Sequence, residues 1–186
     1  MQNEVIFRME NNFAELVQKS RNGDADAFAQ LYSLVYKDLY RVALFNLNNQ
    51  HDASDAVSET VLDAFSSIKN LRNEDAFKGW IMKILTAKIK NKQKEYVQIK
   101  NDRLSLDDLD DKDTELSYEM NYSGGELAED FKKLDKDERL VLSLSVVSGY
   151  KSEEIARMTG MNANTVRSKA ARAKLKLKEL ITGRKS

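Results

Sequence analysis

The sequence contains no cysteine and no proline, and it has a single histidine among its 186 residues. Without cysteine the chain can form no disulfide, no thiolate metal site and no cysteine nucleophile. One histidine leaves almost nothing from which to build a histidine-based metal centre or a catalytic triad. Because nucleophile, base and metal ligands are all scarce, we expect neither an enzyme nor a cofactor or metal site.

Long hydrophobic runs are also missing. No apolar stretch approaches the roughly 18 residues that a membrane-spanning helix requires. The first ten residues contain acids and amides rather than a basic start followed by an apolar stretch, so no secretion signal is expected. We therefore expect a soluble, cytoplasmic protein without membrane insertion. The 30 basic and 30 acidic residues cancel, but a polyanion responds to segregated charge rather than to the total.

Helix-forming residues are abundant instead. Long segments are rich in Ala, Leu, Lys and Glu, and the seven glycines fall mostly where helices are expected to end. Apolar residues recur at helical spacing, so the predicted fold is all-α. The expected helices cover residues 11–21, 25–48, 53–69 and 76–97, then a segment around Leu127–Leu134, one from Asp135 to Ser148, a short one over 152–158 and a long one ending near Ile181.

A change of composition divides the chain. Between residues 101 and 125 aspartate and glutamate crowd a stretch with little apolar periodicity, which is typical of a flexible linker. We expect two small helical domains joined by this acidic linker. The first covers residues 11–97, the linker covers 98–125, and a four-helix domain with a helix-turn-helix covers 126–182.

The segment Ser152–Arg172 has the parts of a helix-turn-helix. A short helix that Ser152 would cap, a turn at Gly160 and a longer basic helix follow one another. In this motif the second helix enters the major groove of DNA, where arginine bonds guanine edges and lysine or serine holds phosphates. The residues expected opposite its apolar seam are Asn164, Arg167, Ser168, Lys169 and Arg172. The alternative is an ordinary helix with a solvated charged face.

Helix 76–97 is a second candidate for nucleic acid. Trp80 and Tyr96 flank several lysines there, and unpaired bases stack on aromatic rings while their phosphates meet the cations. Core packing is the alternative for Trp80, and a solvated face is the alternative for the lysines.

An acidic stripe is the third candidate. Asp52, Asp55, Glu59 and Asp63 recur at helical spacing and are expected opposite the apolar side of helix 53–69. The stripe is either a solvated face or a docking surface for a basic partner helix. The pair His51-Asp52 superficially suggests a metal-dependent phosphohydrolase, but Asp52 is better explained as the N-cap of this helix.

These segments resemble the extracytoplasmic-function (ECF) subfamily of the sigma-70 family, the sigma factors of bacterial RNA polymerase. Motifs of both expected domains occur in the family's order, with the acidic linker between them. The resemblance is carried by Gly23–Phe28, Leu39–Ala43, Asp52–Thr60, Phe77–Ile84, Glu153–Ala156 and Asn164–Ala173.

The resemblance implies a role for each surface. The acidic stripe would dock on the coiled coil of the largest subunit of core RNA polymerase, and the last domain would meet its flap. The last helix, with Thr165 among its contacts, would read the minus-35 element of promoter DNA. The linker would thread toward the active site, and an anti-sigma factor would hold the protein inactive. The residues implied for minus-10 recognition and melting are Asn73, Lys78, Trp80, Lys83 and Lys90.

One further alternative uses the same helix-turn-helix. A stand-alone transcriptional regulator would bind duplex DNA tightly without polymerase, as a dimer with half-sites about one helical turn apart. Nothing in the sequence looks like a dimerisation helix, which disfavours this alternative.

Overall fold

The computed structural model describes residues 13–106 and 125–183, and all of the regular structure within these two ranges is helical. We call the first range the N-terminal group and the second the C-terminal group. The N-terminal group contains a helix over 13–21, α2 (Ala25–Leu47), α3 (Gln50–Ser67), the 3-10 turns η1 (Ile68–Asn70) and η2 (Glu74–Ala76), and α4 (Phe77–Leu106). The C-terminal group contains α5 (Gly125–Lys132), α6 (Lys136–Val146), α7 (Ser152–Thr159) and α8 (Ala163–Gly183). The predicted all-α fold is confirmed.

Two aspartates cap helices at the expected boundaries. The side chain of Asp24 accepts a hydrogen bond from the backbone N–H of Ala27 at 2.9 Å at the start of α2. Asp135 accepts from the backbone N–H groups of Asp137 and Glu138 at the start of α6. In both cases an aspartate satisfies amides that have no partner within the helix, which is why these boundaries were readable from sequence.

Two caps predicted from the sequence, Asp52 and Ser152, are wrong. Asn49 rather than Asp52 caps α3, because Asn48 alone turns the chain in a left-handed conformation (φ 56°) and the helix begins earlier. Similarly, Ser152 is the first residue of α7 rather than its cap. The helix is closed by Glu154, which accepts a hydrogen bond from the backbone N–H of Lys151 at 2.8 Å.

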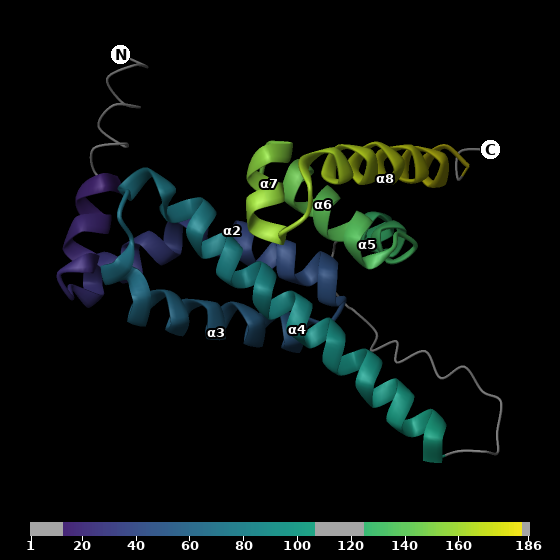
Figure 1. Cartoon of the computed structure of the whole chain (residues 1–186), viewed down its shortest axis with the longest axis horizontal. Coiled ribbons are helices and arrows are strands. Elements are labelled where there is room, and N and C mark those ends of the chain that lie inside the picture. Colours follow the sequence, from purple (N-terminus) through teal and green to yellow (C-terminus); the bar gives the residue numbers. More distant parts are fainter. Residues whose placement is uncertain (1–12, 107–124, 184–186) are drawn as a thin grey trace.

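Helix α4 is longer than predicted. It continues past Val97 to Leu106, because the sequence offers lysine, glutamine and leucine there and no glycine or proline to stop it. Its C-terminal end projects away from the other helices (Figure 1). The predicted linker therefore overlaps the end of α4, and its residues 107–124 lie outside the described residues.

The core of the N-terminal group lies between α2, α3 and α4. Leu31 and Leu39 of α2 and Phe77, Ile81 and Leu85 of α4 are fully buried. Helix α3 presents mainly small side chains to this core, including Ala53, Ala56 and Ala64, so the three helices can approach closely. The buried apolar area provides the main stabilising contribution of the group.

The C-terminal group packs directly on α2 and α4. Leu140 and Leu144 of α6, Ile155 of α7 and Val166 of α8 belong to the same hydrophobic cluster as the core of the N-terminal group. In Figure 1 α6 and α7 accordingly lie against α2 and α4.

Polar contacts also join the two groups. Asn46 donates from Nδ2 to Oγ of Ser143 at 2.9 Å, and the Tyr150 hydroxyl donates to the backbone carbonyl of Lys78 at 3.1 Å. The two groups therefore form one packed body. None of the helices described combines the length and the apolar character needed to cross a bilayer.

Candidate nucleic-acid and protein interfaces

Helices α7 and α8 have the geometry of the predicted helix-turn-helix. Gly160 ends α7 with a left-handed backbone (φ 74°), a conformation that costs little only for glycine. Asn162 then caps α8 by accepting from the backbone N–H of Asn164 at 2.8 Å. Ile155 and Val166 are buried and hold the two helices together. The turn leaves Asn164 and Thr165, at the start of α8, exposed. In Figure 1 this end of α8 lies beside α7.

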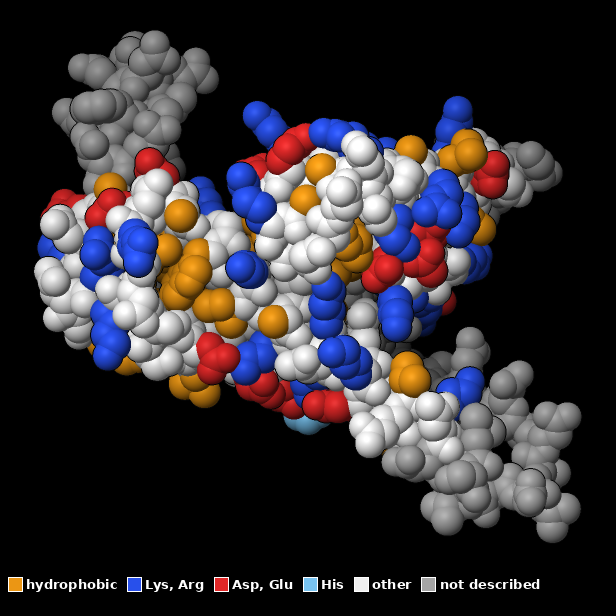
Figure 2. All heavy atoms as spheres, viewed as in Figure 1, with side chains coloured by type: hydrophobic (Ala, Val, Ile, Leu, Met, Phe, Trp, Pro, Cys, Tyr) orange, Lys and Arg blue, Asp and Glu red, His pale blue; other side chains and the backbone are white. Residues whose placement is uncertain are grey.

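Most of the predicted groove-reading residues share the exposed side of α8. Those that the structure leaves exposed are Asn164, Thr165, Arg167, Ser168 and Arg172. Figure 2 shows lysine and arginine side chains gathered around α7 and α8, with acidic side chains between them. The guanidinium of Arg167 donates to Oδ1 of Asn164 at 2.7 Å and forms an ion pair with Glu153 of α7.

The structure corrects the position of Lys169. Its side chain is only 18% exposed and points to α6, where its ammonium lies 3.1 Å from the carboxylate of Asp137. Burial raises the pKa of Asp135, but hydrogen bonds from the backbone N–H of Glu138 and the charge of Lys169 outweigh it and leave that pKa below its ordinary value. This pairing could not be predicted from the sequence, because Asp135 and Asp137 lie more than 30 residues before Lys169 in the chain. Lys169 therefore differs from its neighbours on α8.

Three of the residues predicted for minus-10 recognition, Asn73, Lys78 and Trp80, contact residues of the N-terminal group. Asn73 is exposed and caps η2 by accepting from the backbone N–H of Asp75 at 3.0 Å. The Lys78 ammonium lies 5.1 Å from the centre of the Phe13 ring, a cation–π distance. Trp80 is half-buried, with its ring centre 6.0 Å from that of Phe77. Trp80 thus packs on the core while part of its side chain stays accessible.

Two lysines of α4 differ sharply in their surroundings. Lys83 is exposed, whereas Lys90 is half-buried and donates to the backbone carbonyl of Thr159, the last residue of α7. Gly79 also lies close to the C-terminal group, since a Cβ there would be 3.4 Å from Cε of Met158. The C-terminal group consequently covers Lys90 of α4 in part and leaves Lys83 open to solvent.

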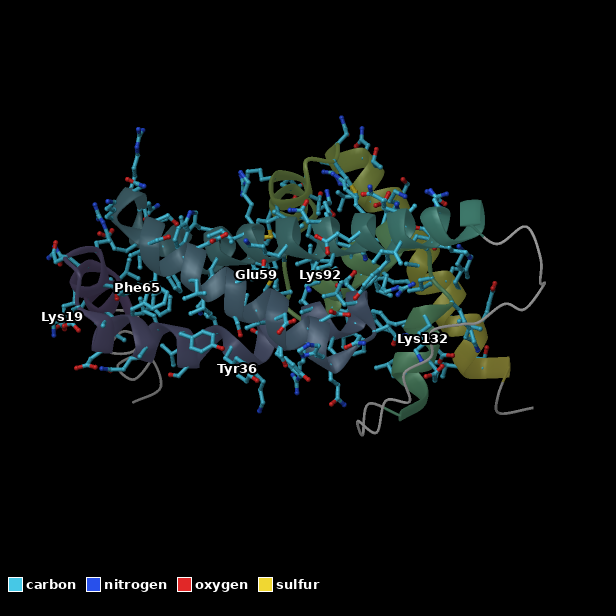
Figure 3. All side chains as sticks on the ribbon, turned by 90° about the horizontal axis from the view of Figure 1, so that it is seen from below. Lys19, Tyr36, Glu59, Phe65, Lys92 and Lys132 are labelled. Atoms are coloured by element: carbon cyan, nitrogen blue, oxygen red, sulfur yellow. The ribbon has the colours of Figure 1, made fainter. Side chains whose placement is uncertain are left out.

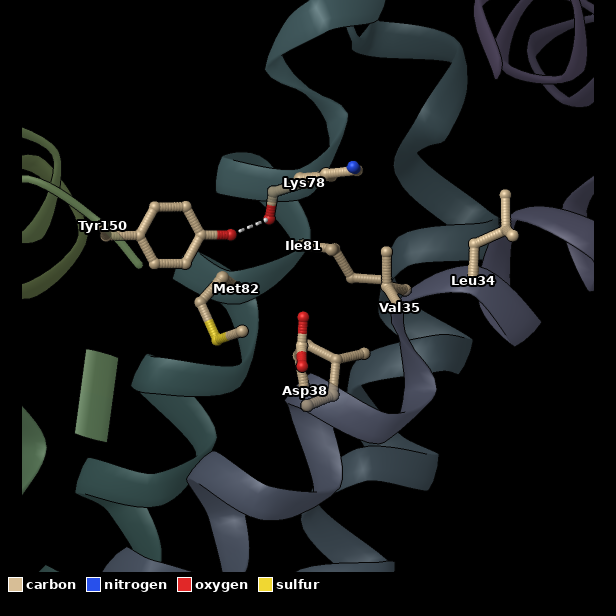
Figure 4. Close-up of a pocket in the computed structure, with 8 residues that line it drawn as sticks. Leu34, Val35, Asp38, Lys78, Ile81, Met82 and Tyr150 are labelled. Carbon is tan, nitrogen blue, oxygen red and sulfur yellow. Dashed lines mark hydrogen bonds between the residues drawn. The ribbon is translucent and has the colours of Figure 1, made fainter. Parts of the chain in front are cut away.

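An open pocket marks the same junction. It lies between α2, the first turns of α4 and the segment that leads into α7, and Figure 4 shows Asp38, Met82 and Tyr150 around it. Leu34 at its rim is 57% exposed. Burial, together with the nearby charges of Asp38 and Glu154, raises the pKa of Tyr150 to about 12, so its hydroxyl is protonated when it donates to Lys78.

The acidic stripe was expected on the side of α3 opposite its buried residues. In the structure it lies next to the buried side instead and faces α4. Lys88 lies 2.7 Å from Asp63 and 3.4 Å from Glu59. The hydrogen bond to Asp63 raises the pKa of Lys88. Lys92 forms a similar link to Asp52 at 3.4 Å, and Figure 3 shows Glu59 and Lys92 on the neighbouring helices.

These ion pairs leave much of the stripe accessible. The side chains of Asp55, Glu59 and Asp63 are 44%, 52% and 54% exposed. By contrast, Asp52 is 22% exposed and also accepts a hydrogen bond from the Tyr96 hydroxyl. Three acids can therefore meet a partner, while Asp52 mainly ties α3 to α4.

Sequence reasoning missed two apolar residues beside the stripe. Leu62 is 69% exposed and Phe65 is 44% exposed on the outer face of α3. Phe65 meets the edge of Phe28 with ring centres 5.0 Å apart, and Figure 3 shows it on the same side as Tyr36 of α2. The outer face of α3 thus combines acidic and apolar groups, as protein-binding surfaces often do.

No cluster of metal-ligating side chains occurs within residues 13–106 and 125–183. His51 lies on the surface, 3.6 Å from Asp55.

Comparison with known families decides between the alternatives. The model of the ECF sigma factor family matches residues 10–181, which include both helical groups. The chain belongs to the ECF sigma factor family. This sigma factor is 32% identical over 140 residues to RNA polymerase sigma factor SigV of Bacillus subtilis (strain 168), a match that covers 74% of this chain and 80% of SigV. It is 24% identical over 177 residues to ECF RNA polymerase sigma factor SigM of Mycobacterium tuberculosis, covering 94% and 87% of the two chains.

Solved structures agree with the fold of this sigma factor. CnrH, solved with the cytosolic domain of CnrY, superposes with a TM-score of 0.66 at 20% identity, covering 92% of this chain and 98% of CnrH. The sigma factor RpoE of Bartonella quintana, solved with the anti-sigma factor NepR, gives a TM-score of 0.69 at 21% identity over 83% of this chain and 96% of RpoE.

Proposed function

We propose that this sigma factor divides promoter recognition between its two helical groups. Residues 126–182 read the minus-35 element as duplex, residues 11–97 bind core polymerase and open the minus-10 element, and residues 98–125 connect the two. The observation that carries this proposal is the helix-turn-helix of α7 and α8, in which Asn164, Arg167 and Arg172 are all exposed on the second helix.

The decisive experiment is transcription in vitro from a pooled promoter library, using core polymerase with and without this protein. Initiation from one defined pair of motifs supports the proposal and identifies the promoter. If core polymerase ignores the protein while the protein alone retains a duplex sequence, the chain acts as a stand-alone regulator and the proposal fails.

Arg167 and Lys169 form a matched pair for the minus-35 contact. Arg167→Ala should weaken recognition by roughly 1–3 kcal/mol, concentrated at one base pair, because arginine bonds a guanine edge in two places. Lys169→Ala removes a charge from the same helix, but its ammonium faces Asp137, so base preference should not change. Competition binding of the holoenzyme to promoters with single base substitutions measures the base preference of both variants. A uniform loss for Arg167→Ala would instead indicate a phosphate contact.

For the minus-10 element we propose the partly exposed ring of Trp80 and the charges of Lys78, Lys83 and Lys90, with Asn73 shaping the preceding loop. Lys83 is exposed in the packed body, whereas Lys90 is bonded to Thr159. Promoter melting through Lys90 therefore requires the C-terminal group to move away from α4.

We further propose that α3 docks on core polymerase through Asp55, Glu59 and Asp63 together with the apolar Leu62 and Phe65. The double change Asp55→Lys and Glu59→Lys should abolish binding, because like charges across an interface repel.

A control for this double change is Glu95→Lys with Glu179→Lys, which alters the net charge equally at two exposed sites on other helices. Binding of labelled protein to core polymerase distinguishes the two variants. Equal affinities would leave the acids of α3 as a solvated face.

Regulation by an anti-sigma factor is the remaining part of the proposal. It is supported by the two solved neighbours, which were determined with the cytosolic domain of CnrY and with the anti-sigma factor NepR. The junction between the two helical groups is the place where one protein could restrain both.

A further inference from the structure

Glu153 of α7 lies where it can hold the side chain of Arg167. Its carboxylate accepts a hydrogen bond from one terminal nitrogen of the guanidinium, and Asn164 accepts from the other at 2.7 Å. One contact comes from the neighbouring helix and the other from the preceding turn of α8. The guanidinium is thus fixed from two directions at the exposed N-terminal end of the helix.

The ion pair has no evident role in the fold. The side chains of Glu153 and Arg167 are 57% and 54% exposed, and exposed pairs of this kind contribute little to stability. The N-terminus of α7 is closed by Glu154, and the packing of α7 on α8 rests on Ile155 and Val166. A hydrogen bond from its own backbone N–H, followed by that from Arg167, lowers the pKa of Glu153, so the carboxylate is charged at neutral pH.

Two of the five guanidinium donors of Arg167 are engaged in this way, which leaves three. A guanine edge needs two, so the held side chain can still make a bidentate contact. A side chain that is already ordered loses less freedom on binding. In addition, the negative charge of Glu153 repels phosphates and discourages Arg167 from turning to the DNA backbone.

We propose that Glu153 is a positioning residue that sets the specificity of Arg167 for one base pair of the minus-35 element. The inference rests on the proposed function of α8 and names the residue that tunes it. It predicts that Glu153 acts on discrimination between sequences more than on total affinity for DNA.

The test uses full-length protein with core polymerase and promoters substituted singly across the minus-35 element. Arg167→Ala first identifies the base pair that depends on Arg167. Glu153→Ala should then reduce discrimination at that base pair about 3- to 10-fold, as expected when pre-ordering is lost, without changing the other positions. Affinity for non-promoter DNA should rise and depend more steeply on salt, because a released arginine gains a phosphate contact.

Three further variants make the test selective. Glu153→Gln keeps an acceptor at the same length and should retain part of the discrimination. Glu179→Gln removes an exposed acid elsewhere on α8 and should change nothing. In the Arg167→Ala background, Glu153→Ala should have no further effect on discrimination. Urea unfolding of every variant should give the wild-type midpoint.

The outcomes separate the inference from the proposed function. If wild-type holoenzyme shows no minus-35 preference, both fail. If the wild type discriminates and Glu153→Ala does so equally well, only the positioning role is overturned. A loss spread over all positions, or one that persists in the Arg167→Ala background, also overturns it.

Discussion

The N-terminal and C-terminal groups of this sigma factor bury their interiors differently. Helices α2, α3 and α4 of the N-terminal group supply most of the large apolar cluster, including the fully buried Leu31, Leu39 and Ile81. In the C-terminal group, Leu140 and Ile155 belong to a cluster that α2 and α4 of the other group complete. The N-terminal group therefore contributes most of the shared cluster, whereas the C-terminal group contributes a few residues to it and has besides, among the residues described, only the small cluster of Phe131, Leu134, Leu142 and Ala173. Separating the two groups would remove contacts that make up a larger share of the buried apolar surface of the C-terminal group.

The largest differences in stability between the two groups are expected when side chains of the core are truncated. Phe77→Ala removes a fully buried ring of the N-terminal group and should cost about 3–5 kcal/mol. Because the C-terminal group packs on α4, hydrogen exchange should accelerate in both groups.

The matched change is Leu142→Ala, at a fully buried residue in the small cluster of Phe131, Leu134 and Ala173. It should cost about 2–5 kcal/mol, with faster exchange mainly in the C-terminal group and a smaller effect on α2, whose Phe45 packs against this cluster. If Leu142→Ala loosened α2 and α4 equally, the asymmetry between the groups would be wrong.

The next effect concerns a buried charge in the C-terminal group. Glu138 of α6 is 1% exposed, and its carboxylate lies 2.7 Å from the ammonium of Lys176 on α8. Lys176→Met would leave the carboxylate without this partner and should destabilise the protein by about 1–3 kcal/mol in urea unfolding.

Lys178→Met on the exposed side of α8 is the control for this change and should be nearly neutral. Adding Glu138→Gln to Lys176→Met should recover part of the loss, since it removes the buried charge. Failure of this recovery would argue against an electrostatic cause.

A smaller effect is expected at the junction itself. Asn46 is 3% exposed and links α2 to Ser143 of α6, so Asn46→Ala should cost about 1 kcal/mol. The absence of cysteine allows two introduced cysteines, one on α3 and one on α8, to carry the only thiol-linked labels. The distribution of distances between the two labels should be broader in Asn46→Ala than in the wild type. It should stay narrow in Asn91→Ala, which changes an exposed residue of α4.

The smallest effect appears only in alkali. Burial raises the pKa of Tyr150 from 10.0 to about 12, so the folded state favours the protonated hydroxyl. Its contribution to stability is fully present below pH 10.0 and is lost as the pH rises toward about 12. Tyr150→Phe cannot ionise, and its unfolding free energy relative to the wild type should rise through this window. A constant difference would mean that the hydroxyl is not buried at the junction.

Local signals explain what could be predicted from the sequence. Helical periodicity, the aspartate caps at Asp24 and Asp135 and the glycine turn at Gly160 act over a few residues, and the all-α fold and the geometry of α7 and α8 followed from them. Asn49 and Asp52 offered two equally good caps, and only the tight turn at Asn48 decided between them.

The rest depended on partners distant in the chain. Lys169 and Arg172 look alike in sequence, yet Asp137 draws Lys169 toward α6 while Arg172 stays exposed. In the same way, Lys88 and Lys92 of α4 pair with the stripe on α3. Periodicity gives the face of a helix but not the element that the face will meet.

The bond between Lys90 and the end of α7 links the two groups thermodynamically. The carbonyl of Thr159 is one of the terminal acceptors that a helix cannot satisfy internally. A ligand that draws the Lys90 ammonium toward the outer face of α4 withdraws the donor from α7. Coupling of this kind is reciprocal: whatever loosens α7 makes Lys90 easier to recruit, and whatever recruits Lys90 makes the helix-turn-helix easier to release.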